Sequence, residues 1–246
     1  MEKKRKFEIT SAGLHILAML LMLCDHLWGT VVSGNDWLTC LGRIAFPIFA
    51  FMTVEGYFHT KNLKKYMLRM LLFAVLSEIP FNLAMGSRWF YPIHQNVLWT
   101  FLIGMCLIRW NEKAKAGGKL WKRMLVGTLS VLLGMVLGLL TMVDYHHAGV
   151  LTVLVFYFCR GRKWWQRLGQ LVCLWYINVE ILSGFAYEVE IFGQTQWIVR
   201  QGFALLALIP IWLYRGKQGH HSKAFQYFCY SFYPLHLLIL GLLKFL

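Results

Sequence analysis

Long apolar runs recur along the whole 246-residue chain, and they constrain its fold more than any other feature. A helix that crosses a bilayer needs about 20 mostly apolar residues. The runs cover residues 10–32, 38–59, 66–86, 96–110, 124–142, 147–160, 167–184, 198–214 and 229–246. They predict an all-α, polytopic integral membrane bundle with about nine transmembrane helices, which forms a single domain over residues 1–246.

The overall composition excludes two other classes of protein. The chain is 58% hydrophobic and only 15% charged. Soluble domains carry about 25% charged residues, and disordered chains are far less hydrophobic. Neither class is therefore compatible with this sequence.

The basic residues are distributed in a way that indicates an orientation. The formal net charge is +14, and 21 of the 25 Lys and Arg residues lie before the first run or at every second junction between runs. The intervening junctions carry acidic residues such as Asp36 and Asp144 and one clear basic residue, Arg88. Because short basic loops stay in the cytoplasm, we expect a cytoplasmic N-terminus and an outer C-terminus. The charge then indicates topology in a lipid bilayer rather than nucleic-acid binding.

Ionisable residues inside the first two runs are candidates for a functional site, because such groups are costly in a bilayer unless they are paired or face a cavity. His15 and His26 are 11 residues apart, which places them on one helix face, about 16 Å apart along the axis. Asp25 precedes His26, and Arg43 lies at a similar depth in the next run. An Asp25–Arg43 ion pair is therefore geometrically easy, and Pro47 is expected to kink the second helix.

Further polar residues lie in the later runs. Glu55 is predicted near the cytoplasmic end, Glu78 and Asn96 near the outer end, and Tyr233 and His236 in the cytoplasmic half of the last helix. Structural interpretations exist for some of them: an ion pair that only joins helices, a satisfied core histidine, or a Glu55 that reaches the interface. Together, however, they favour a shared polar cavity. No cysteine or histidine spacing indicates a metal site.

These residue types suit two tasks. A histidine with a nearby carboxylate is a natural general base, and an arginine can stabilise developing negative charge. A polar path between His15 and His26 fits the transfer of an activated group across the membrane. It fits equally a transporter or flippase that uses the polar residues as a proton relay. A structural subunit of a transfer machine is a third possibility. The chain has no G-x-S-x-G elbow, P-loop or H-E-x-x-H motif.

The sequence resembles the TraX family, membrane proteins linked to the acetylation of conjugative pilin. The matching stretches are 20–26 (LLMLCDH), 42–51 (GRIAFPIFAF), 54–56 (VEG), 66–69 (YMLR), 77–81 (SEIPF), 95–98 (QNVL), 214–217 (YRGK) and 232–237 (FYPLHL). TraX itself looks like a branch of a wider superfamily of transmembrane acyltransferases. The resemblance covers most of the chain, with one departure: His15 stands where the family usually has lysine.

The resemblance implies a bacterial cytoplasmic-membrane acetyltransferase. Cytoplasmic acetyl-CoA would be the donor, and a pilin N-terminus, an envelope glycan or a small amine would be the outer acceptor. Carried over, the resemblance gives His26, Asp25 and Arg43 catalytic roles. It also places donor binding at His15, Tyr233 and His236, and a lining role at Glu55, Glu78 and Asn96. No metal is expected.

Overall fold

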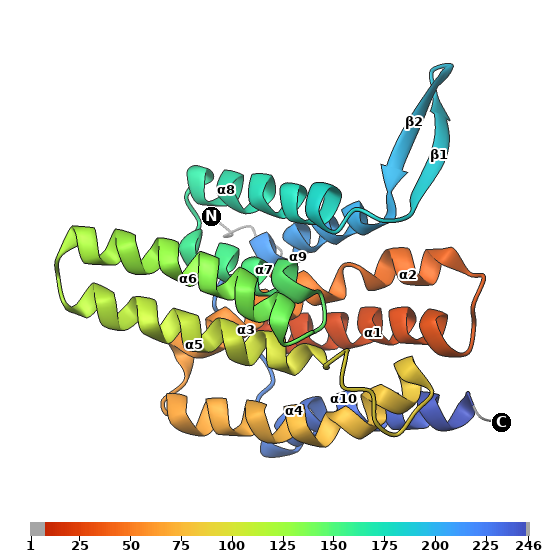
Figure 1. Cartoon of the computed structure of the whole chain (residues 1–246), viewed down its shortest axis with the longest axis horizontal. Coiled ribbons are helices and arrows are strands. Elements are labelled where there is room, and N and C mark those ends of the chain that lie inside the picture. Colours follow the sequence, from red (N-terminus) through yellow and green to blue (C-terminus); the bar gives the residue numbers. More distant parts are fainter. Residues whose placement is uncertain (1–7, 245–246) are drawn as a thin grey trace, which may run out of the picture.

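The computed structural model describes residues 8–244, and most of them are helical (Figure 1). The elements in chain order are α1 (Ser11–Thr30), α2 (Asp36–Gly42), α3 (Ala45–His59), α4 (Leu63–Gly86), α5 (Val97–Ala116), α6 (Leu120–Leu140), α7 (His146–Phe158), α8 (Trp164–Trp175), the π-helix η1 (Tyr176–Ile181), β1 (Ala186–Ile191), β2 (Gln194–Val199), the 3-10 helix η2 (Arg200–Ala207), α9 (Leu208–Leu213) and α10 (Lys223–Leu243).

Five of the helical segments are long and apolar enough to cross a membrane. They are α1, residues 36–59 (α2 with α3), α4, α6 and α10. The other four predicted runs are also helical, but α7 has 13 residues and η2 with α9 spans only 200–213. The protein is therefore a helical membrane protein in its basic architecture.

The outer helices expose apolar side chains on the face away from the bundle, as helices that contact lipid do. On α6, only Ser130, Gly134 and Gly138 are buried, one turn apart on a single face. Small residues at this spacing let helices approach closely in a bilayer. Leucines such as Leu132 and Leu140 stay exposed on the other face, where lipid can cover them.

The helix α3 lies at the centre of the molecule. Eight of its 15 residues are buried, among them Ile48, Ala50 and Val54. The largest hydrophobic core forms where α1, α5, α7 and α9 pack around it. Helices α4 and α10 pack against each other along one side of the bundle, and α8 lies on the opposite side (Figure 1).

The bundle has two chemically different ends. We call the end formed by loops 60–62, 117–119, 159–163 and 214–222 the basic end, because the Lys- and Arg-rich junctions lie there. We call the opposite end, formed by loops 31–35, 87–96 and 141–145 and by the two strands, the hairpin end (Figure 1). The alternation of basic and non-basic junctions along the sequence corresponds to this division.

The fold is mainly helical as predicted, and a β-hairpin is an addition that the sequence analysis did not foresee. Strands β1 and β2 pair antiparallel, from Ala186 opposite Val199 to Ile191 opposite Gln194, and they project away from the helices (Figure 1). The two turn residues, Phe192 and Gly193, have φ of 52° and 73°. Positive φ at both central residues matches the tight turn whose twist suits a two-residue hairpin. This polar, strand-forming segment lies between two apolar runs, and its first strand alternates polar and apolar residues.

The second predicted span is broken rather than continuous. α2 ends at Gly42 and α3 begins at Ala45, so that Arg43 lies at the interruption. Pro47 follows in the first turn of α3, where its missing N–H removes no helical hydrogen bond. The break places Arg43 in the bundle interior at the level of the end of α1.

Candidate functional site

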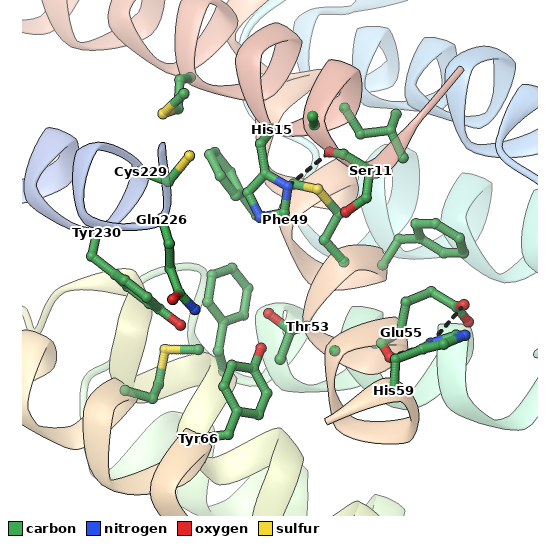
Figure 2. A pocket seen from close by; sticks show the side chains of 18 of the residues that line it. Ser11, His15, Phe49, Thr53, Glu55, His59, Tyr66, Gln226, Cys229 and Tyr230 are labelled. Carbon is green, nitrogen blue, oxygen red and sulfur yellow. Dashed lines mark hydrogen bonds and ion pairs between the residues drawn. The ribbon is translucent and has the colours of Figure 1, made fainter. Parts of the chain in front are cut away.

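A large cavity opens at the basic end between α1, α3, α4 and α10. Its volume is about 490 Å³. Polar side chains of Thr53 from α3, Tyr66 from α4, and Gln226 and Tyr230 from α10 gather around it, with His15 of α1 on another side (Figure 2). Apolar residues line the rest, including Met19, Met22, Phe49, Met52, Met70, Val97, Leu98 and Phe101. A mixed lining of this kind suits a long ligand with few polar groups.

One face of α1 runs along the cavity toward the hairpin end. His15, Met19 and Met22 line the cavity, and His26 follows one turn further on the same face. The His15 Nδ1–H donates to the Ser11 carbonyl at 2.8 Å, which fixes the ring. Tyr233 also lines the cavity, and its ring centroid lies 6.3 Å from that of His26. The cavity lining thus reaches Tyr233, a neighbour of His26, while His26 itself is not among the lining residues.

His26 and His236 form a hydrogen-bonded pair, although 210 residues separate them. The His236 Nδ1 donates to the Phe232 carbonyl at 2.6 Å, since a carbonyl can only accept. The neutral His236 ring then has an acceptor at Nε2, which lies 2.6 Å from the Nδ1 of His26. His26 must donate through Nδ1, which leaves the lone pair on its Nε2. No residue within 8–244 forms a hydrogen bond with that nitrogen.

This arrangement corrects the placement of His236. We expected it in the cytoplasmic half of the last helix, beside the donor path with Tyr233. The helix α10 begins at Lys223, so His236 lies in its second half and contacts His26 instead of lining the cavity.

Asp25 and Arg43 form an ion pair at the break between α2 and α3. The Asp25 Oδ1 also accepts a 2.8 Å hydrogen bond from the Thr39 hydroxyl. Helices α1 and α2 come this close because position 42 is glycine: a Cβ there would lie 2.3 Å from the Asp25 Cβ. The Asp25 carboxylate is held from two directions, and it fixes one side of the guanidinium.

A second set of contacts holds Arg43 from the other side. Its Nη1 donates to Gln201 Oε1 at 3.4 Å, and Gln201 Nε2 donates to Asn178 Oδ1 at 3.0 Å. Asn178 lies in the π-helix η1, a local distortion that is frequent at functional sites. The Arg43 guanidinium also lies 5.9 Å from the Tyr145 ring centroid. Its Nε is buried and has no hydrogen-bond partner among the described residues.

Glu78 and Asn96 form a separate network at the hairpin end. The Asn96 side-chain amide donates to Glu78, and Trp99 Nε1 donates to Glu78 Oε1 at 2.7 Å. Asn96 also caps α5, where its Oδ1 accepts from the Leu98 N–H at 3.1 Å. The pair joins α4 to the start of α5.

Glu55 lies at the basic end, where it faces the large cavity and pairs with Arg160. The Arg160 Nε donates to Glu55 Oε1 at 2.7 Å. The sequence-predicted residues thus divide into a cavity group (His15, Glu55, Tyr233), a histidine pair (His26, His236), an ion pair (Asp25, Arg43) and a polar network (Glu78, Asn96). A single cavity does not collect them all.

Several residues of the site were missed at the sequence level. Thr39, Asn178 and Gln201 are ordinary neutral polar residues within apolar runs, and only their contacts with Asp25 and Arg43 reveal a role. Within residues 8–244, no three His, Cys, Asp or Glu side chains gather in a way that could hold a metal ion.

Comparison with known proteins identifies the family of this chain. The model of the family described as TraX protein matches residues 10–244. A probable fimbrial assembly protein, FimC of serogroup H1 from Dichelobacter nodosus, is 32% identical over 78 residues, which are 30% of this chain and 32% of that relative. The match therefore spans about a third of that relative's length. No solved structure matches. Because the family match runs from the first helix to the last, the chain belongs to the TraX family.

Proposed function

We propose that this protein is a membrane acetyltransferase that takes the acetyl group from cytoplasmic acetyl-CoA and passes it to an acceptor at the outer face. The proposal places the basic end and the N-terminus in the cytoplasm of a bacterium, with nine helical segments crossing its cytoplasmic membrane. The distribution of basic loops supports that orientation. The observation that carries the proposal is the His26 Nε2, which has no hydrogen-bond partner among residues 8–244, on a ring 6.3 Å from Tyr233, a lining residue of the cavity that opens among those loops.

The cavity has the right character for the donor. Acetyl-CoA carries a long, mostly neutral arm that ends in the thioester. In the proposal this arm passes His15, Gln226 and Tyr230 and ends near Tyr233. From His15 to His26 the path along α1 is about 16 Å. The thioester would thus come near His26 while the phosphates stay at the basic end.

The hydrogen-bond chain gives His26 the state that a general base needs. His236 holds the His26 ring through Nδ1, as an orienting partner does in a catalytic triad. The His26 Nε2 takes a proton from the acceptor amine or hydroxyl while the acceptor atom forms a bond to the thioester carbonyl carbon. The carbon–sulfur bond then breaks, the proton passes to the thiolate, and coenzyme A leaves as the thiol.

Arg43 supplies positive charge for the oxyanion in this mechanism. Its contacts with Asp25 and Gln201 hold the guanidinium before the reaction begins, so little reorganisation is needed when charge develops. Its buried Nε, which has no hydrogen-bond partner among the described residues, is a donor available for that purpose. Glu78 and Asn96, on the same end of the bundle, form part of the acceptor side in the proposal.

The acceptor that we favour is the N-terminal amine of a pilus or fimbrial subunit. The similarity to a probable fimbrial assembly protein supports this choice. An envelope glycan and a small amine are the alternative acceptors, because each would present a nucleophile to the same His26 Nε2.

The test uses the purified protein in vesicles, with labelled acetyl-CoA outside and a peptide with a free N-terminal amine inside. We expect release of coenzyme A and acetylation of the enclosed peptide, and no label on the same peptide with a blocked N-terminus. Thioester hydrolysis without peptide labelling would support acetyl-CoA as the donor and reject the N-terminal amine as the acceptor. Solute flux that needs no acetyl-CoA, with no thioester turnover, would instead support a transporter and reject the enzyme.

A further inference from the structure

A second cavity of about 370 Å³ lies at the basic end, between α3, the loop before α8 and the segment after α9. Four arginines line it: Arg160, Arg162, Arg167 and Arg215. The remaining lining residues include Gln170, Trp212 and Tyr214. This concentration of guanidinium groups distinguishes it from the large cavity, whose lining is mainly apolar.

Two of these four arginines form no ion pair within residues 8–244, although the charge of Arg162 also acts on Glu8. Arg160 forms an ion pair with Glu55, and the Arg215 Nε lies 3.7 Å from Glu8 Oε1. Arg162 and Arg167 form no ion pair with any described residue. The Arg167 guanidinium lies 5.6 Å from the Trp212 ring centroid, and Trp212 is itself held by a 2.8 Å hydrogen bond to Gln170. The cavity thus contains positive charge that no ion pair among the described residues neutralises.

The two cavities share a wall. Phe51, Glu55, His59, Tyr214 and Gly216 line both of them. The Phe51 and Tyr214 rings meet edge to face at 5.7 Å within this wall. His59 and Gly216 are exposed, so the cavities adjoin where they reach the surface of the basic end. A single ligand can therefore place an anionic group in one cavity and a neutral arm in the other.

We propose that the arginine cavity binds the phosphate groups of a nucleotide-linked thioester donor, with Arg162 and Arg167 as the main contacts. The inference rests on the proposed function and adds the binding site for the anionic part of the donor. Arginine is suited to this task, because its planar guanidinium forms paired hydrogen bonds with phosphate oxygens. Anionic phospholipid headgroups carry the same chemistry and are the competing source of phosphate.

The main experiment measures binding of coenzyme A to the full chain in nanodiscs of zwitterionic lipid. The test protein carries Arg162→Gln and Arg167→Gln. The matched control carries Lys119→Gln and Arg123→Gln, which remove two exposed charges from the basic end but line neither cavity. We expect binding to weaken about tenfold for each lost arginine, so about a hundredfold in the test protein, and less than threefold in the control.

Three further arms separate the possible outcomes. A pantetheine thioester, which lacks the nucleotide phosphates, is expected to bind wild type and test protein equally. Arg162→Lys with Arg167→Lys is expected to regain part of the coenzyme A affinity, because the charge returns without the planar fork. In nanodiscs with anionic phospholipid, coenzyme A is still expected to bind more tightly to wild type than to the test protein.

Coenzyme A binding that is equal in wild type and test protein overturns the inference and leaves the proposed function standing. Absence of coenzyme A binding to wild type overturns the proposed function as well. Retention of anionic lipid that depends on Arg162 and Arg167, without such dependence for coenzyme A, assigns the cavity to lipid and also overturns the inference.

Discussion

The two ends of the bundle use charge differently. At the hairpin end, Asp25 holds Arg43 and Asn96 holds Glu78. At the basic end, Arg162 and Arg167 border a cavity and form no ion pair among residues 8–244. Charges that are fixed in advance can stabilise a reacting group without reorganisation. Charges that lack a partner can bind an anion that arrives from outside. In the proposed function, the hairpin end is the reacting end and the basic end is the binding end.

Removing one acid from each end gives the sharpest comparison. Asp25→Ala leaves Arg43 in a site where its side chain is 20% exposed, whereas Glu55→Ala leaves Arg160 at 36% exposure. We expect Asp25→Ala to lower the free energy of unfolding by about 3–5 kcal/mol, because an unpaired buried charge is costly. Glu55→Ala is expected to cost less than about 1 kcal/mol, because water can solvate Arg160.

Chemical denaturation in detergent measures both changes. Asp25→Asn serves as a further variant, since it keeps the hydrogen bond from Thr39 but removes the charge. Equal losses for Asp25→Ala and Glu55→Ala would mean that the two ends do not differ in this way.

The close approach of α1 and α2 is the next target. A Cβ at position 42 would overlap the Asp25 side chain, whereas one at position 127 would meet no atom closer than 3.8 Å. We expect Gly42→Ala to destabilise the protein by about 1–3 kcal/mol through overpacking, while Gly127→Ala, inside α6, is neutral or stabilises it by up to about 1 kcal/mol because alanine favours the helix. Thermal unfolding of the two variants side by side checks this, and a neutral Gly42→Ala would reject the tight contact.

Gln201 tests whether the hairpin end is arranged for chemistry and not only for stability. Gln201→Leu removes the acceptor for Arg43 and leaves Asn178 Oδ1 without its donor, which costs about 1–3 kcal/mol. We expect acetyl transfer to slow about tenfold at an unchanged KM for acetyl-CoA. Gln201→Glu, which still accepts from Arg43, is expected to keep most of the rate. A change in KM alone would place Gln201 in donor binding instead.

The smallest effect concerns a loop at the hairpin end. The hydrogen bond from His94 to Asp144, at 3.4 Å, raises the pKa of the His94 imidazole above its ordinary value of 6.5. A raised pKa in the folded state stabilises the protein below pH 6.5, and this stabilisation is lost as the pH rises through the folded pKa. The side chain is 36% exposed, so solvent limits the effect to a fraction of about 1 kcal/mol.

Unfolding midpoints of wild type and His94→Gln between pH 5 and about pH 8.5 measure this contribution. The difference between the two proteins is expected to shrink as the pH rises. A difference that does not vary with pH would show that the His94–Asp144 contact contributes nothing to folding.

The sequence predicted the helices well because apolar runs of bilayer length leave few other structures open. It failed where the backbone departs from that pattern. The β-hairpin depends on a two-residue turn at Phe192 and Gly193 between strands that alternate polar and apolar residues. The start of α10 was placed too late, because its first two turns face the large cavity and carry polar residues such as Gln226. Because the helix was predicted to start later, His236 was expected in its first half, and its contact with His26 was not foreseen.

The candidate site was only partly predictable for a related reason. Four ionisable residues stand out in the apolar helices: His15, His26, Asp25 and Arg43. The Asp25–Arg43 ion pair was predicted from the similar depth of these two residues in neighbouring runs. The contact between His26 and His236 depends on how α1 and α10 pack, and the support of Arg43 depends on a π-helix and a 3-10 helix. Such packing and local distortion leave no periodic signal in the sequence.

If His26 is the general base, its removal must slow acetyl transfer without weakening donor binding. Initial rates of acetyl transfer and coenzyme A affinity are compared for wild type, His26→Gln and the control His146→Gln, an exposed histidine at the same end. We expect His26→Gln to lower the rate by about 10²- to 10⁴-fold with coenzyme A affinity unchanged, while His146→Gln retains the wild-type rate. Transfer at the wild-type rate by folded His26→Gln protein would show that His26 is not the base.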